Sequence, residues 1–231
     1  MDGHGKPKFR GHSHQHAFLV ALGAGAMLVS ASSPHATLAV AIYVASLVSL
    51  FGVSALYHRP MWSERTRELF KRLDHSMIFV LLAGTYTPFC VLALPWSLGR
   101  VILSVMWGLG GVLVVTKLAG IEMPRWLTTA SYVGLGWFAA WSIPDAIPQV
   151  GISGALLLIA GGVFYTLGAV IYWRKRPNPV PHVFGYHEVF HVFVVVASLL
   201  HFVAIARLVL SPAPPLAPAA ADVGNRSVID Q

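Results

Sequence analysis

Histidine, aspartate and serine residues recur at the ends of three apolar stretches of this chain. Ser54 and His58 close one stretch, Asp74 opens the next, and His187 and His191 open the last. Ionisable groups at the edge of a hydrocarbon layer are costly, so they are rare unless they pair, bind an ion or do chemistry. Their repeated placement at segment ends predicts a buried metal site, with zinc as the expected ion.

The spacing within each stretch places these side chains on shared helix faces. Ser54 lies four residues before His58, and His187 lies four residues before His191, which is one helical turn. Three imidazoles with an open fourth position form the ligand set of a catalytic zinc, whose bound water deprotonates near neutral pH. Asp74, from a neighbouring helix, is suited to accept that proton or to orient a ligand. The predicted site therefore has metal ligands and catalytic residues as follows: His58, His187 and His191 for the metal, and Asp74 and Ser54 for catalysis.

The composition indicates a membrane protein. Of the 231 residues, 56% are hydrophobic and only 11% are charged, whereas a soluble domain carries about a quarter charged residues. The single cysteine, Cys90, excludes an internal disulfide framework and a cysteine-based zinc cluster, so any zinc must be held by histidine and carboxylate. The net charge of +7 comes from basic residues between apolar spans, where it reports topology rather than a nucleic-acid partner.

The apolar stretches have the length of membrane spans. About 20 predominantly apolar residues cross the hydrocarbon core as a helix. The chain offers seven such stretches, so we predict an all-α, polytopic membrane protein with a seven-transmembrane helix bundle. The predicted spans are residues 17–32, 36–57, 75–94, 98–118, 126–147, 149–173 and 187–210. The first span has an alternative interpretation as a signal peptide, because basic residues precede it and small residues end it.

The distribution of basic residues predicts the orientation. Of the 16 Lys and Arg residues, 13 lie in the leader and in alternate connections on one side of the predicted membrane. By the positive-inside rule, the amino terminus is cytoplasmic and the carboxyl terminus is outside, in the cell membrane. The site residues then all lie near the cytoplasmic face. Residues 1–16 are predicted to be a disordered His-rich cytoplasmic leader, residues 17–210 the membrane domain, and residues 211–231 a disordered outside tail.

The motifs together resemble a known family. At their spacings they are similar to the haemolysin III family, part of the progestin and adipoQ receptor superfamily, which is distantly similar to alkaline ceramidases. The resemblance covers about residues 16–210. The motifs that carry it are Ser54 with His58, Arg72 through Asp74 and His75 to Phe79, Ala83 to Pro88, and His187 with His191.

The resemblance implies seven transmembrane helices, a cytoplasmic amino terminus and a zinc ion near the cytoplasmic face. It assigns the zinc to His58, His187 and His191, places Asp74 beside the zinc water, and matches Ser54 to the family's serine. Members often carry a Glu-x-x-Asn-x-x-x-His pattern before the first helix. Here the region from Arg10 to His16 lacks the Glu and the Asn, and His14 or His16 could stand at the last position.

Four functions compete. The first is a zinc-dependent hydrolase of lipid amide or ester bonds, in which Asp74 relays a proton and Ser54 helps to hold the developing oxyanion at a zinc-polarised carbonyl. The second is a receptor or membrane-state sensor that binds lipid and holds a structural zinc. The third is a cytolytic haemolysin, as the family name implies, although the sequence contains no amphipathic arm to insert into a target membrane. The fourth is an intramembrane protease that uses the His-Glu-x-x-His pattern with Glu188 as its base.

Overall fold

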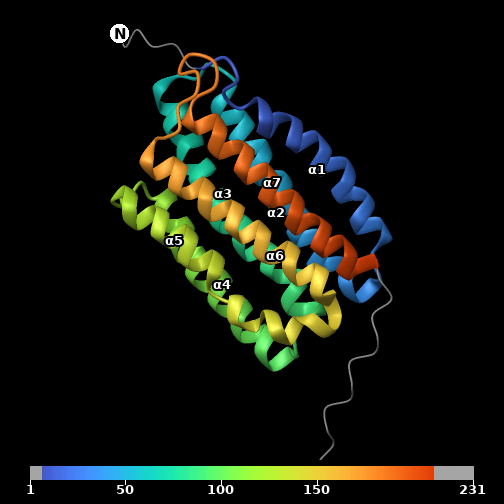
Figure 1. Cartoon of the computed structure of the whole chain (residues 1–231). Coiled ribbons are helices and arrows are strands. Elements are labelled where there is room, and N and C mark those ends of the chain that lie inside the picture. Colours follow the sequence, from blue (N-terminus) through green and yellow to red (C-terminus); the bar gives the residue numbers. More distant parts are fainter. Residues whose placement is uncertain (1–6, 211–231) are drawn as a thin grey trace, which may run out of the picture.

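The computed structural model describes residues 7–210 as a bundle of long α-helices that lie side by side (Figure 1). Helices close their backbone hydrogen bonds internally, as hydrocarbon requires of a spanning segment. Apart from an isolated bridge between Val180 and Phe184, residues 7–210 contain no β-structure. In chain order the elements are α1 (His12–Ala31), α2 (Pro34–His58), α3 (Glu64–Leu92), α4 (Trp96–Leu118), α5 (Arg125–Trp137), the 3₁₀ turn η1 (Ala140–Ser142), α6 (Ile143–Arg174) and α7 (Tyr186–Leu210).

The outer surface of the bundle is apolar. Six helical stretches among residues 7–210 are long and apolar enough to cross a membrane, with Arg125–Arg174 counted as one of them. Large apolar side chains are exposed on several helices, including Leu19 (59% exposed), Leu38 (73%) and Val112 (62%). A water-soluble protein rarely exposes so much apolar surface. The chain is therefore an integral membrane protein, and the predicted all-α membrane class is confirmed.

The stretch Arg125–Arg174 folds back on itself. As one straight helix, its 50 residues would extend about 75 Å, more than twice the hydrocarbon thickness. Instead, the Arg125 guanidinium at its start lies 4.6 Å from the ring centre of Tyr172 near its end. The Trp137 indole N–H also donates to the Thr166 hydroxyl at 2.8 Å. Helices α5 and α6 are therefore antiparallel neighbours joined through η1 (Figure 1).

The predicted end of the fifth span, at residue 147, is wrong. The sequence predicts one helix over residues 126–147, whereas α5 ends at Trp137 and the short η1 turn leads into α6. Pro144 stands in the first turn of α6, where its missing N–H breaks no helical hydrogen bond. Farther along, Gly151 interrupts α6 with a φ of 70°, which glycine adopts without a Cβ clash. The chain therefore turns earlier than hydropathy indicates.

Helix α1 begins at His12, five residues before its predicted start at Ala17. The end of the predicted disordered leader is thus helical, and His14 is buried at 3% exposure. Its burial against neighbouring helices offsets the polar composition of this segment, so the prediction of disorder does not hold for residues 12–16. Residues 1–6 and the predicted tail at 211–231 lie outside the described residues.

Helix α3 begins at Glu64, about three turns before the predicted span that starts at His75. The Ser63 hydroxyl caps its first turn by accepting a backbone N–H at 3.4 Å. Glu68 then pairs with basic residues three and four positions later, which supports an exposed helix. Asp74 consequently lies inside a continuous helix, where its direction is fixed by the helical backbone.

Small residues allow the helices to approach closely. Helices α1 to α4 pack in chain order, while α7 contacts both α6 and α1 and so closes the bundle. Gly84 on α3 lies so close to Ser46 on α2 that a Cβ there would overlap the serine side chain. Such contacts matter in membranes, because lipid tails are as apolar as the helix faces and close packing supplies the attraction.

Candidate metal centre

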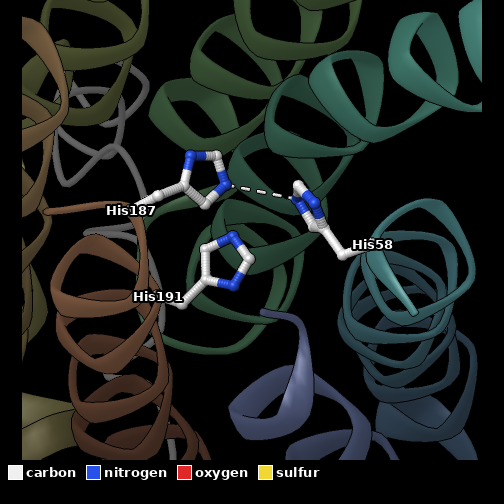
Figure 2. A group of neighbouring side chains, drawn as sticks. All are labelled: His58, His187 and His191. Atoms are coloured by element: carbon white, nitrogen blue, oxygen red, sulfur yellow. Dashed lines mark hydrogen bonds between the residues drawn. The ribbon is translucent and has the colours of Figure 1, made fainter. Parts of the chain in front are cut away.

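The side chains of His58, His187 and His191 point toward one another, as Figure 2 shows. His58 is the last residue of α2, and His187 and His191 lie one turn apart at the start of α7. Their ligand-type nitrogens all lie within 4.8 Å of one another. The Nε2 atoms of His58 and His187 are 3.2 Å apart (Figure 2). The three residues predicted as metal ligands therefore lie together, although His58 and His187 are 129 residues apart in the sequence.

One pair of nitrogens in the cluster has the separation expected of two zinc ligands. Zinc–nitrogen bonds of about 2.0–2.1 Å at a tetrahedral angle separate two ligand nitrogens by about 3.3 Å. The 3.2 Å between His58 and His187 matches this separation. His58 and His191 are buried and His187 is partly buried, so a bound cation would be shielded from water. Imidazole suits zinc and other divalent transition metals, so the cluster can hold such an ion.

Asp74 approaches the cluster from α3. Its Oδ2 atom lies 3.9 Å from the Nε2 atom of His58. This gap is too long for a direct hydrogen bond and suits a bridging water. The Ser54 side chain, buried one turn before His58, lines the same cavity as Asp74 and lies close to its carboxylate. Both residues predicted as catalytic thus lie beside the cluster.

Glu188 makes other contacts. Its carboxylate forms an ion pair with the Arg10 guanidinium and accepts the Gly185 N–H at 2.8 Å, which caps the start of α7. Glu188 is 2% exposed and does not line the cavity beside the imidazoles. Its oxygens are therefore occupied in holding the chain together, unlike those of a protease base. Nothing in the sequence marks the pairing of Arg10 with a residue so distant along the chain.

Residues 8–14, which we call the N-terminal strap, pack against the cluster. Two backbone N–H groups of the strap donate to carbonyls of the loop before α7, each at 3.2 Å. Gly11 has a φ of 79° and lies against His58, where an added Cβ would come within 2.8 Å of the histidine Cβ. Only glycine meets both the conformational and the spatial requirement.

His14 is the site residue that sequence reasoning left undecided. Its ring stacks on the ring of His191, with centroids 3.8 Å apart and planes 8° apart. Phe51 meets the His14 ring edge-on at 5.1 Å. His16, the other histidine that could end the family's leading motif, is exposed. The structure therefore places His14, and not His16, next to the cluster. Helical periodicity extended back from the predicted first span, which begins at residue 17, was the available signal.

A cavity extends from the cluster into the bundle. It is lined by residues of α7 from His187 to His201, a span of about 21 Å along the helix axis. Its volume of about 190 Å³ far exceeds the roughly 10–15 Å³ that one water needs. Beyond the cluster its walls are chiefly apolar and aromatic, including Ile78, Leu81, Phe89, Trp137, Leu158 and Phe190. An elongated apolar molecule with a polar end at the imidazoles suits this space.

Comparison with known proteins decides the family. The sequence profile described as Haemolysin-III related matches residues 4–202, which is most of the chain. The chain belongs to the haemolysin III family. The resemblance that the motifs indicated is thereby confirmed, and the matched region includes the N-terminal strap as well as the three histidines.

Relatives of this family member occur in bacteria and in humans. Hemolysin-3 of Bacillus cereus is 31% identical, with 81% of this chain and 84% of the relative aligned. Hemolysin-3 homolog of Bacillus subtilis (strain 168) is also 31% identical, over 70% of this chain and 72% of the relative. The human monocyte to macrophage differentiation factor is 28% identical, over 71% of this chain and 67% of its own length.

Proposed function

We propose that this haemolysin III family member is a zinc-dependent hydrolase that cleaves an amide or ester bond of a membrane lipid and so affects lipid homeostasis. The observation that carries the proposal is the position of Asp74 beside three imidazoles at the end of a largely apolar cavity. Three histidine ligands leave a tetrahedral zinc one open position, as in catalytic sites. A lipid amide or ester joins an apolar chain to a polar carbonyl, which matches the two ends of the cavity.

Each residue has a distinct role in this proposal. His58, His187 and His191 hold the zinc ion, which when bound supplies Lewis acidity to a water or carbonyl at the open position. Asp74 accepts a proton from the attacking water and returns it to the leaving nitrogen or oxygen. Ser54, which lines the cavity close to Asp74, keeps the Asp74 carboxylate directed at the cluster. The apolar cavity binds the hydrocarbon chain of the lipid and excludes water from the site.

We further propose that the chain crosses the cell membrane seven times, with α5 and α6 as the fifth and sixth spans. The amino terminus is then cytoplasmic, and the metal cluster lies near the cytoplasmic face. The antiparallel contact of α5 with α6 supports two crossings, as does the 13-to-3 distribution of basic residues. Alone, the 13 residues of α5 extend about 20 Å, so the following turn completes its crossing.

The test is product analysis with purified, zinc-loaded protein in nanodiscs that contain lipid amides and lipid esters. Wild-type protein is expected to release free fatty acid, detected by mass spectrometry. Asp74→Asn should retain zinc but lower the rate by about 10²–10⁴-fold, because it removes a positioned general base. Glu188→Gln should keep most of the activity per folded molecule, since Glu188 does not line the cavity.

One result would contradict the hydrolase, and another would contradict the role of Asp74. Wild-type protein with a full complement of zinc that releases no fatty acid from either lipid class would favour the alternative, a lipid receptor or sensor with structural zinc. An inactive Glu188→Gln variant beside an active Asp74→Asn variant would instead assign the general base to Glu188, as in the His-Glu-x-x-His pattern, and contradict the role proposed for Asp74.

A further inference from the structure

Within residues 7–210, the Nδ1 atom of His191 makes no hydrogen bond that could fix the orientation of its ring. Metal-binding histidines almost always donate their second ring N–H to a carboxylate, carbonyl or water, and this contact sets the direction of the ring. The Nδ1 atom of His191 is buried and has no hydrogen-bond partner among residues 7–210. Among the described residues, the contacts that can hold this imidazole in the direction that metal binding requires are those of its ring.

His14 supplies the closest ring contact to His191. The two rings are nearly parallel, 8° apart in plane, with centroids separated by 3.8 Å. The ring contacts of His191 with His58, His187 and Phe190 are edge-on or tilted, with centroids at least 4.5 Å away. A stacked ring restricts rotation of its partner more than edge contacts do, because tilting either ring drives one edge into the other.

His14 acts through its ring face in this geometry. Both of its nitrogens are buried without a well-aligned hydrogen bond to another described residue, although the His191 backbone lies beside the ring. It is not one of the three residues whose nitrogens form the cluster. A side chain that contacts a metal ligand with its face, and no ion with its nitrogens, has the arrangement of a positioning group.

The N-terminal strap holds His14 in place. Its backbone is tied to the loop before α7, and Arg10 is ion-paired with Glu188 on the same helix as His191. Gly11 packs against His58 with no room for a side chain. The strap is thus attached to both helices that provide metal ligands, and its last residue, His14, carries the stacked ring.

We propose that His14 is a positioning residue of the metal centre, which orients His191 for zinc by ring stacking and makes zinc affinity depend on the N-terminal strap. This inference rests on the proposed zinc site. It adds a fourth histidine to the centre without adding a fourth ligand, so the open coordination position is kept.

The experiment measures zinc affinity of purified full-length protein by competition with a chromogenic chelator. His14→Ala should weaken zinc binding by about 10–100-fold, the usual effect of losing a group that orients a ligand. His14→Phe retains a flat ring that can stack and should stay close to wild type. His16→Ala, on the exposed side of the same helix, is the matched control and should bind zinc normally. Thermal unfolding of each variant reports whether the bundle is intact.

A cobalt-substituted sample gives a second readout. The visible spectrum of His14→Ala should shift relative to wild type, and that of His14→Phe should not. Unchanged zinc affinity in His14→Ala would overturn the inference while leaving the zinc site standing. Equal losses in His14→Ala and His14→Phe would also overturn it, because the nitrogens of His14 would then be required. Wild-type protein that binds no zinc would refute the proposed zinc site and this inference together.

Discussion

We expect the three clustered imidazoles to contribute unequally to zinc binding, because they come from two helices. His187 and His191 lie one turn apart on α7, so losing either removes half of a preformed pair. We expect His187→Ala or His191→Ala to abolish zinc binding and His58→Ala to weaken it severely, as measured by metal analysis after dialysis. His35→Ala is the control, because that exposed histidine contacts only Ser33 among the described hydrogen bonds. Full zinc content in the His187→Ala/His191→Ala double variant would remove this site from consideration.

A second prediction at the residue scale concerns the buried carboxylate of Glu188. The Glu188 side chain is 2% exposed, and Arg10→Ala removes the cation beside its carboxylate. The free energy of unfolding should therefore fall. Because the Arg10 side chain is itself 22% exposed, we expect a loss of roughly 1–3 kcal/mol, below that of a fully buried pair. Thermal or denaturant unfolding in detergent measures this loss. The Arg10→Ala/Glu188→Ala double variant should be more stable than Arg10→Ala alone, and equal stability of the two would contradict the pairing.

At the scale of helices, close packing between α2 and α3 sets the position of Asp74 relative to His58. A side chain at Gly84 would overlap Ser46, so Gly84→Val should push the two helices apart and cost about 1–3 kcal/mol of stability. Gly108→Val on α4 is the matched control, since a Cβ at Gly108 meets no atom within 4 Å. Unfolding temperatures in one detergent compare the two variants. Similar stability for both would show that the α2–α3 contact is not close in the membrane.

At the scale of the whole molecule, the distribution of basic residues predicts the direction of every helix. Reporter fusions after Arg65 and after Arg174 should report cytoplasm, and a fusion after Pro212 should report the outside. Each position is fused in parallel to alkaline phosphatase and to a fluorescent protein, so that the two reporters together distinguish the outside from the cytoplasm. A cytoplasmic reading after Pro212 would require an even number of spans, and one of α5 and α6 would then not cross.

The sequence by itself determined the membrane class, the family and the identity of the three clustered histidines. These follow from local chemistry, because uninterrupted apolar runs must lie in hydrocarbon and ionisable residues at their ends must have partners. Hydropathy also located α2, α4 and α7 to within two residues of their ends. It failed at the start of α1 and α3, since helices continue through polar residues wherever caps, ion pairs or buried contacts support them.

Only the tertiary structure decided the positions of Glu188 and His14 relative to the three imidazoles. The pattern His-Glu-x-x-His gives Glu188 a possible catalytic role, yet its carboxylate is taken by Arg10 from the other end of the chain. The choice of His14 over His16 likewise depends on which face of α1 meets α7. Contacts between residues more than a hundred positions apart arise from how whole helices pack, and such packing leaves no signal in the local spacing of a single sequence.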